Sequence, residues 1–403
     1  MGLLLVTATG ICSMMGASIN VIPFMIQKNV PGIGPYVVPA FLFAAIPAVF
    51  AAYAYAILSS AMPRAGGSYL YASRGLSPYL GFIASLSQWF GLSIVIDVIS
   101  YIIVPFIRDI FFNLELNNIS DFLEIGYVRL FISLMLIWSF VLVNILGGKV
   151  YKNTLIPMLV IMFVLGSIVI VTGFIYDQKD FINSVLSTDN RVIETISDSK
   201  FDLKIFLTAA TLMFSSFIGF DAIAQTGNEA KNPTKNIPRA ILLAIFIVAS
   251  SYILFTVSVY NVVPWNFVAD ESLTKDITAP GLLSYVLPSF WGILIIIGAA
   301  IALINDLPAM ILSVSRLMFA WARDNIFPSS VAIIHSKFKT PYIAIIFVGI
   351  VASIGAIGSH FAGDFFLGID IMVTSMMINF LLMCITIISI EKVNQKLFRT
   401  ITV

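Results

Sequence analysis

Charged residues, cysteine and histidine are scarce in this chain. Only 11% of its 403 residues are Asp, Glu, Lys or Arg, about half the share of a typical soluble domain. The formal net charge of +1 indicates no nucleic-acid or acidic partner. The two cysteines, Cys12 and Cys384, lie in apolar segments, which excludes a disulfide framework, and His335 and His360 are isolated. We therefore predict no metal and no cofactor.

The motifs of common enzyme active sites are also missing. The chain has no Walker A loop, no HExxH zinc motif and no GxSxG nucleophile elbow. Its few ionisable residues do not cluster in the sequence as a catalytic set. The sequence therefore predicts that the protein is not an enzyme.

Long hydrophobic runs are abundant, and 59% of the residues are hydrophobic. Ten segments are near or above the length of about 20 residues that a helix needs to cross a bilayer. We predict an all-α integral membrane protein with about ten transmembrane helices. The first segment does not resemble a secretory signal, because its first basic residue is Lys28. The ten segments are roughly 2–27, 37–62, 80–106, 127–147, 154–176, 205–229, 239–261, 290–318, 341–358 and 365–390.

Lys and Arg residues in the connections predict the orientation. If the N-terminus is cytoplasmic, fourteen of them fall on the inner side and eight on the outer side, in agreement with the positive-inside rule. An even number of spans then places both termini in the cytoplasm. We expect a multi-pass protein of the plasma membrane, surrounded by the lipid bilayer; the sequence does not specify its oligomeric state.

The sixth segment contains residues that a plain membrane anchor lacks. Gly219 and Asp221 lie in its middle, and by helical rise Gly219 is roughly 22 Å from Lys204 and 15 Å from Glu229, near the midplane. A helix break there leaves backbone groups that lipid cannot satisfy, so they must face protein, water or a solute. We interpret this stretch as half of a substrate site.

The first segment has a similar centre, SMMGASIN, from Ser13 to Asn20. Close packing of small residues between helices is the alternative interpretation. Two interrupted helices, each opening a set of five spans, are typical of inverted-repeat transporters. The predicted divisions are a first repeat, 1–176, an extracellular connecting loop, 177–204, a second repeat, 205–390, and a cytoplasmic tail, 391–403.

Several motifs carry a family resemblance. They are PRAGGSYLYASRGLSPYLGF from Pro63 to Phe82, FIGFDAIAQTGNEAKNPTKNIPRA from Phe217 to Ala240, and SRLMFAWARDNIFP from Ser315 to Pro328, followed by KTPY. Over essentially its whole length the chain resembles the amino acid-polyamine-organocation (APC) superfamily of permeases. The resemblance implies a five-plus-five, leucine-transporter-like fold with broken first and sixth helices and alternating access to a central amino-acid site.

The chain departs from the family pattern at four points. Gly16-Ala17-Ser18 replaces the usual Gly-small-Gly, Ile57 replaces a frequent Glu, and Ala302 replaces a frequent Ser three residues before Asn305. The chain also begins almost at its first span and stops after its tenth, whereas many relatives have a leader and twelve spans. The core fold is still expected, but dimerisation through extra helices is not.

The two interrupted segments supply the candidate substrate site. Backbone N–H groups freed in the first segment can donate to a carboxylate, aided by the positive end of the following half-helix. Carbonyl groups freed in the sixth segment can accept from an ammonium group. The candidate binding residues are Met15, Gly16, Ala17 and Ser18 in the first segment and Phe214, Ser215, Phe217, Ile218, Gly219 and Phe220 in the sixth.

Three of these residues, Phe214, Phe217 and Phe220, recur at intervals of three. We expect at least two of them to line one wall of the site and to close over a bound side chain. Packing or lipid contact is the alternative for any single Phe, because the chain contains 33.

Three carboxylates, Asp97, Asp221 and Asp306, lie in the interior of apolar spans, with no Lys or Arg close by in the sequence. A buried carboxylate without a basic partner must be protonated, bind a cation or face water. Asp221 is the leading coupling residue, because it adjoins the predicted break. Asp97 and Asp306 are further candidates, and capping a kink at Pro308 is the alternative role of Asp306.

The coupling ion is inferred by comparison with the family. In the leucine-transporter fold sodium is commonly held by first-helix carbonyls and eighth-helix hydroxyls, but Ile297 to Leu303 has no hydroxyl. Some relatives place a Lys in the fifth span, but Thr154 to Tyr176 has no basic residue. We therefore predict proton-coupled amino-acid symport. Open alternatives are a cationic substrate paired with Asp221, an amino acid/polyamine exchanger, and a non-transporting amino-acid sensor or channel.

Overall fold

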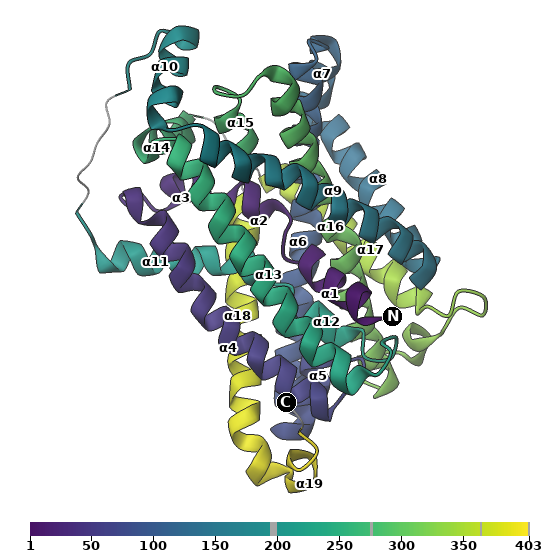
Figure 1. Cartoon of the computed structure of the whole chain (residues 1–403). Coiled ribbons are helices and arrows are strands. Elements are labelled where there is room, and N and C mark those ends of the chain that lie inside the picture. Colours follow the sequence, from purple (N-terminus) through teal and green to yellow (C-terminus); the bar gives the residue numbers. More distant parts are fainter. Residues whose placement is uncertain (194–199, 275–276, 363–364, 402–403) are drawn as a thin grey trace.

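Helices make up the regular secondary structure of the described chain (Figure 1). The structure is a computed structural model and describes residues 1–193, 200–274, 277–362 and 365–401. Within these ranges nine helical stretches are long and apolar enough to cross a membrane, and they coincide with nine of the ten predicted segments. The nine are Gly34–Ala61, Pro78–Phe112, Gly126–Ile145, Gly148–Ile175, Leu203–Gln225, Pro233–Val262, Ser289–Arg323, Tyr342–Phe361 and Gly368–Val393.

The long helices are joined by short helical connections. The long ones are α4 (Val37–Ala61), α6 (Pro78–Asn113), α8 (Gly126–Ile145), α9 (Gly148–Ile175), α13 (Pro233–Val262), α16 (Ser289–Arg323), α17 (Tyr342–Ala362) and α18 (Phe365–Val393). The connections contain η1 (Gly34–Tyr36), α5 (Gly67–Gly75), α7 (Asn117–Glu124), α10 (Gln178–Asp189), α14 (Trp265–Thr274), α15 (Ala279–Leu283), η3 (Ser329–Ala332) and α19 (Gln395–Phe398).

The remaining predicted segment, 2–27, which comes first in the chain, is not one long helix. It contains α1 (Leu3–Cys12), α2 (Ala17–Asn20) and the start of α3 (Ile22–Asn29). α1 is apolar but has only 10 residues, far fewer than the roughly 20 that span a bilayer. It ends where the small and polar residues of SMMGASIN begin. Apolar composition alone therefore overestimates the length of this helix.

The stretch from residue 203 to residue 225 is also divided. It consists of α11 (Leu203–Met213), the 3-10 helix η2 (Phe214–Phe217) and α12 (Ala222–Gln225). Between η2 and α12, Gly219 has a φ of 135°, a backbone conformation that residues with a side chain rarely adopt. A glycine is therefore required at the point where the chain leaves η2.

The predicted connecting loop, 177–204, contains the helix α10. Asp177 starts this helix with a capping box: its side chain accepts from the Asp180 N–H at 3.0 Å, and the Asp180 side chain accepts from the Asp177 N–H at 3.0 Å. Polar composition suggested a loop, but this local pairing stabilises a helix on a polar surface. Residues 194–199 of the predicted loop lie outside the described residues.

The helices α6 and α16 form the centre of the bundle. They are the most buried of the nine candidate spans, and they pack against each other. α6 also packs against α18, and α16 packs against α9. α13 packs against α4 and α1, so the short helix α1 lies among long ones (Figure 1).

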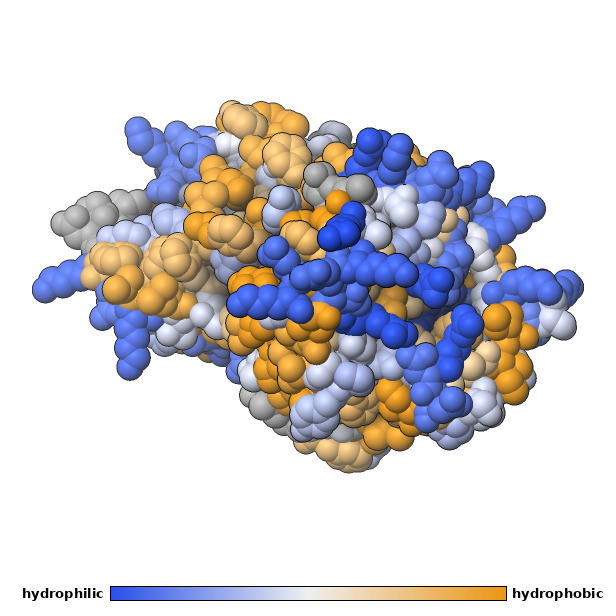
Figure 2. Space-filling model, turned by 90° about the horizontal axis from the view of Figure 1, so that it is seen from below, coloured by the Kyte–Doolittle hydropathy of each residue, from blue (hydrophilic) through white to orange (hydrophobic). Residues whose placement is uncertain are grey.

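The outside of the bundle is apolar. Phe174 of α9, Phe246 of α13, Phe361 of α17 and Ile388 of α18 are each at least 70% exposed. Figure 2 views the molecule from below, at the lower end of Figure 1. Hydrophilic side chains run across the middle of this lower end, with hydrophobic ones beside them. Apolar sides and a hydrophilic end suit lipid tails around the helices and water beyond them.

Candidate functional site

The two divided segments touch each other inside the bundle. A Cβ atom added at Gly219 would lie 2.1 Å from the carbonyl oxygen of Ser13, so the two backbones are in direct contact. Beside this contact, Tyr252 of α13 donates its hydroxyl hydrogen to the Met14 carbonyl. Non-helical backbone from two distant parts of the sequence is therefore gathered at one place.

A small cavity lies next to this contact. Its polar lining residues come from three elements: Ser13 precedes α2, Ser215 belongs to η2, and Asp306 belongs to α16. Of the residues predicted for the site, the cavity brings together Ser215, Ile218 and Asp306. The other lining residues are Met14, Ile22, Val95, Val98, Ile99, Met310, Ile369 and Met372.

Some of the backbone groups predicted to be free have partners within the chain. The Met15 N–H donates to the Ile11 carbonyl at 2.9 Å, and the Ser215 carbonyl accepts from the Ile218 N–H at 3.1 Å. The Gly16 N–H differs, because it donates to no backbone carbonyl of the described residues. Gly16 therefore has a backbone donor that is free of a backbone partner among the described residues.

The remaining first-segment candidates lie close by. Met15 lines a second, mostly apolar cavity together with Ile19 and Asn20 of α2. Ala17 and Ser18 form the first turn of α2, but their side chains lie outside the described part of the structure.

The three predicted phenylalanines belong to aromatic clusters. Phe214 and Phe220 both pack against Phe380 of α18, with ring centroids 5.9 and 5.1 Å apart. Phe217 packs in another direction, against Phe41 of α4, at 5.5 Å. Two of the three thus pack on the same ring of α18, the third packs η2 against α4, and none of the three lines the small cavity.

Asp221 is fully buried and both of its carboxylate oxygens are hydrogen-bonded. The Gly219 N–H donates to Oδ1 at 3.1 Å, and Gln88 of α6 donates to Oδ2 through Nε2. Gln88 Oε1 accepts in turn from the Ser68 hydroxyl at 2.5 Å. Asp221 therefore connects the turn at Gly219 to the central helix α6.

Gln225 of α12 extends this network. Its Nε2 donates to Gln88 Oε1 at 3.5 Å, and its Oε1 accepts from the Gly66 N–H at 3.1 Å. The sequence argument missed Gln88 and Gln225 as site residues. Both are amide side chains in apolar segments, and a buried amide needs a polar partner. This pattern could have indicated that they belong to a buried polar network.

Asp97 lies away from the cavity. Its Oδ2 accepts from the Ser359 hydroxyl at 2.9 Å, and a Cβ added at Gly355 would lie 2.7 Å from its Cγ. Asp97 is therefore enclosed between α6 and α17. In the described part of the chain, no three His, Cys, Asp or Glu residues form a group that could hold a metal ion.

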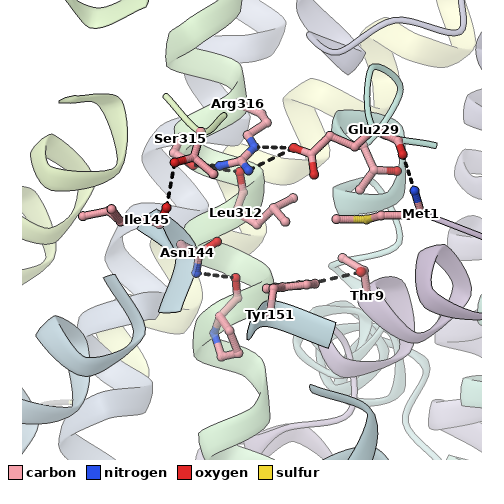
Figure 3. A network of polar contacts seen from close by, with 12 residues as sticks. Met1, Thr9, Asn144, Ile145, Tyr151, Glu229, Leu312, Ser315 and Arg316 are labelled. Atoms are coloured by element: carbon pink, nitrogen blue, oxygen red, sulfur yellow. Dashed lines mark hydrogen bonds and ion pairs between the residues drawn. The ribbon is translucent and has the colours of Figure 1, made fainter. Parts of the chain in front are cut away.

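A buried ion pair connects α16 to the loop after α12 (Figure 3). The Arg316 side chain is 6% exposed, and its Nε and Nη2 donate to Glu229 Oε1 at 3.0 and 2.9 Å. Nearby, Asn144 of α8 donates to the Pro308 carbonyl at 3.1 Å, and Tyr151 of α9 donates to Thr9 Oγ1 at 3.2 Å. The pair and its neighbours thus connect α16 to the loop after α12 and to α8, and α9 to α1.

A second polar contact holds α5 to the end of α16. The Tyr69 hydroxyl donates to Asp324 Oδ2 at 2.7 Å. Burial and then the bond to Asp324 raise the pKa of the Tyr69 phenol above its usual value, so it remains a proton donor.

The nine helical stretches of the described residues that are long and apolar enough to cross a bilayer define a multi-pass membrane protein. The family model described as "Amino acid permease" matches residues 1–403. The chain belongs to this family, whose members are permeases and not enzymes.

Individual relatives match over shorter segments. The branched-chain amino acid permease BcaP of Bacillus subtilis is 30% identical over 149 residues, which are 36% of this chain and 31% of that protein. Cationic amino acid transporter 9 of Arabidopsis thaliana, a chloroplastic protein, is 29% identical over 208 residues, 48% of this chain and 35% of its own. Cationic amino acid transporter 4 of Mus musculus is 28% identical over 151 residues, 38% of this chain and 23% of its own. The matches thus span about a third of these relatives or less.

Proposed function

We propose that this protein is a secondary active transporter that moves amino acids across the membrane by alternating access. The observation that supports this most directly is the contact between Ser13 and Gly219 beside a cavity lined from both segments. In transporters, interrupted helices commonly carry the substrate site. The family and the names of its relatives, which include a branched-chain amino acid permease and cationic amino acid transporters, support amino acids as substrates.

We assign α1 to α3 to a broken first helix and α11 to α12 to a broken sixth helix. These helices would open two inverted five-span repeats, 1–176 and 205–390. The ten spans would then be the nine long helical stretches and the divided first segment. The Gly16 N–H then faces the substrate carboxylate. The carbonyl groups of residues 214–218 lie on the side of the substrate ammonium group.

Reconstitution into liposomes tests this function. We expect saturable, gradient-dependent uptake of at least one labelled amino acid, with none into protein-free liposomes. Uptake that requires an amino acid or polyamine inside the vesicle would instead indicate an exchanger. Binding without flux would contradict the transporter and support a sensor of the same fold.

The orientation is tested by cysteine labelling in a background in which Cys12 and Cys384 are replaced by Ser. Asn190 and Thr234 are both exposed, at the end of α10 and the start of α13. We expect Asn190→Cys to react with an impermeant thiol reagent added outside cells and Thr234→Cys to react only after permeabilisation. The opposite labelling pattern would reverse the proposed topology, in which both termini are cytoplasmic in the plasma membrane.

We also propose that a proton drives uptake and that Asp221 carries it, with Asp97 as the alternative carrier. Asn at position 221 retains a hydrogen-bonding oxygen but cannot release a proton in this way. We expect an inward proton gradient to drive wild-type uptake without sodium, and Asp221→Asn to lose this dependence. Loss in Asp97→Asn alone would identify the alternative carrier, and a strict sodium requirement would contradict proton coupling.

A further inference from the structure

One interior carboxylate, Asp306, has an oxygen without a partner among the described residues. The Asp306 residue is 2% exposed, its side chain lines the small cavity beside Gly219, and its Oδ1 accepts no hydrogen bond from the described residues. The hydroxyl of Ser13, which lines the same cavity, is also buried without a partner there. A buried polar atom left unpaired destabilises the folded protein, and more so if it is charged. A ligand that brings several hydrogen-bond donors would remove this cost.

The other two interior carboxylates each have a donor. Asp221 has donors for both oxygens, and Asp97 Oδ2 accepts from Ser359, although its Oδ1 has no donor among the described residues. The cavity next to Asp306 is lined by no Lys, Arg or His, and Arg316, further along α16, is paired with Glu229. The cavity therefore contains an acidic group without a basic counter-charge. A cationic group of the ligand would supply that charge.

The position of Asp306 relative to the first segment narrows the choice of ligand. A Cβ added at Gly16 would lie 1.6 Å from Asp306 Oδ2, so the carboxylate lies directly against the Gly16 backbone. In an α-amino acid only one carbon atom separates the ammonium nitrogen from the carboxylate carbon. If the Gly16 N–H binds the substrate carboxylate, the ammonium group is within reach of Asp306.

We propose that Asp306 and the Ser13 hydroxyl form the subsite that binds the α-ammonium group of the substrate. The site therefore selects amines, and it accepts α-amino acids in preference to the corresponding 2-hydroxy acids. Asp306 supplies the negative charge, and the Ser13 hydroxyl supplies a second acceptor. Gly16 has no side chain, which leaves the space in which the Asp306 carboxylate approaches the first segment. This assignment rests on the proposed transport of amino acids and identifies the side chain that recognises them.

The test measures binding to the purified full chain. Thermal-shift measurements with the twenty common L-amino acids select the tightest binder, and isothermal titration then compares it with its 2-hydroxy analogue. The variants are Asp306→Asn, which removes the charge at nearly constant shape, and Asp306→Glu. Ser313→Ala is the matched control, because Ser313 is buried on the same helix without lining this cavity. Size-exclusion chromatography reports folding.

We expect wild-type protein to bind the amino acid at least tenfold more tightly than the 2-hydroxy acid, and Asp306→Asn to lose most of this ratio. The Ser313→Ala variant should retain it. An unchanged ratio in folded Asp306→Asn would overturn the assignment. A ratio below tenfold in wild-type protein would do the same, even if no Asp306 variant folds.

Two other occupants of the subsite give different results. If Asp306 holds sodium, wild-type binding will require sodium, and Asp306→Asn will lose that requirement while it keeps the amine-to-hydroxyl ratio. If Asp306 only carries a proton, the ratio will be equal in both proteins and the pH dependence of binding will differ. Either result overturns the ammonium subsite but leaves the transport function intact. Failure of wild-type protein to bind any amino acid would overturn both.

Discussion

Replacing Gly219 with leucine is expected to abolish amino-acid binding. The φ of 135° is strained for any residue with a side chain, and even a Cβ would lie 2.1 Å from the Ser13 carbonyl oxygen. The neighbouring atom belongs to backbone and cannot rotate away. The substitution must therefore push the two backbones apart at this contact, and with them the part of the cavity wall formed by Ser13 and Met14.

Two measurements test this prediction. Ligand-induced thermal shifts report binding, and size-exclusion chromatography reports whether the variant remains inserted and folded. Gly358→Leu on α17 is the matched control, because a Cβ there meets no atom within 4 Å and the site faces outward. Wild-type binding by Gly219→Leu would show that the contact with Ser13 is a packing feature without a part in the site.

Removing the carboxylate from Glu229 is expected to cause the second large effect. Arg316 is almost completely buried, and its Nε and Nη2 both donate to Glu229, which is 33% exposed. The Glu229→Gln variant leaves a buried guanidinium without a counter-charge, and breaking such a pair costs about 3 kcal/mol. We expect a clear fall in the thermal unfolding midpoint of the purified protein.

A compensating variant separates the lost pair from the unpaired charge. Arg316→Met combined with Glu229→Gln removes both charges and fills the space with an apolar chain, so it should recover most of the lost stability. Equal destabilisation of the single and double variants would mean that packing, and not the charge, makes the contact important.

The span pattern was largely predictable from the sequence, because each long helix exposes apolar side chains to lipid along its length. The first segment, 2–27, was predicted as a span with an unusual centre at Ser13 to Asn20, and the described chain divides there into α1, α2 and α3. The sequence did not indicate how short α1 is, because counting apolar residues joined it to the helices that follow. The helix α10 was missed for the opposite reason, since its stability begins with the capping box of Asp177 on a polar surface.

The sequence indicated where to look for the candidate site but not its pairings. Gly219 and Asp221 are visible as anomalies in an apolar run, and in the structure Gly219 contacts the Ser13 backbone and donates its N–H to Asp221. The sequence contains no signal that Asp221 meets Gln88, which is 133 positions away, or that Gly16 meets Asp306. Such pairs depend on how the helices cross, and local residue patterns do not encode that geometry.

The contacts of the first segment also constrain the order of assembly during biosynthesis. The carbonyl of Met14 receives its hydrogen bond from Tyr252, which is 238 residues later, and Cys12 accepts from Asn305, which is 293 residues later. At about 5–20 residues per second, a ribosome needs roughly 12 to 48 s to reach Tyr252 after Met14. The N-terminal segment therefore leaves the ribosome long before its partners exist. Until they arrive, its unpaired backbone must be protected by water, the insertion machinery or a chaperone.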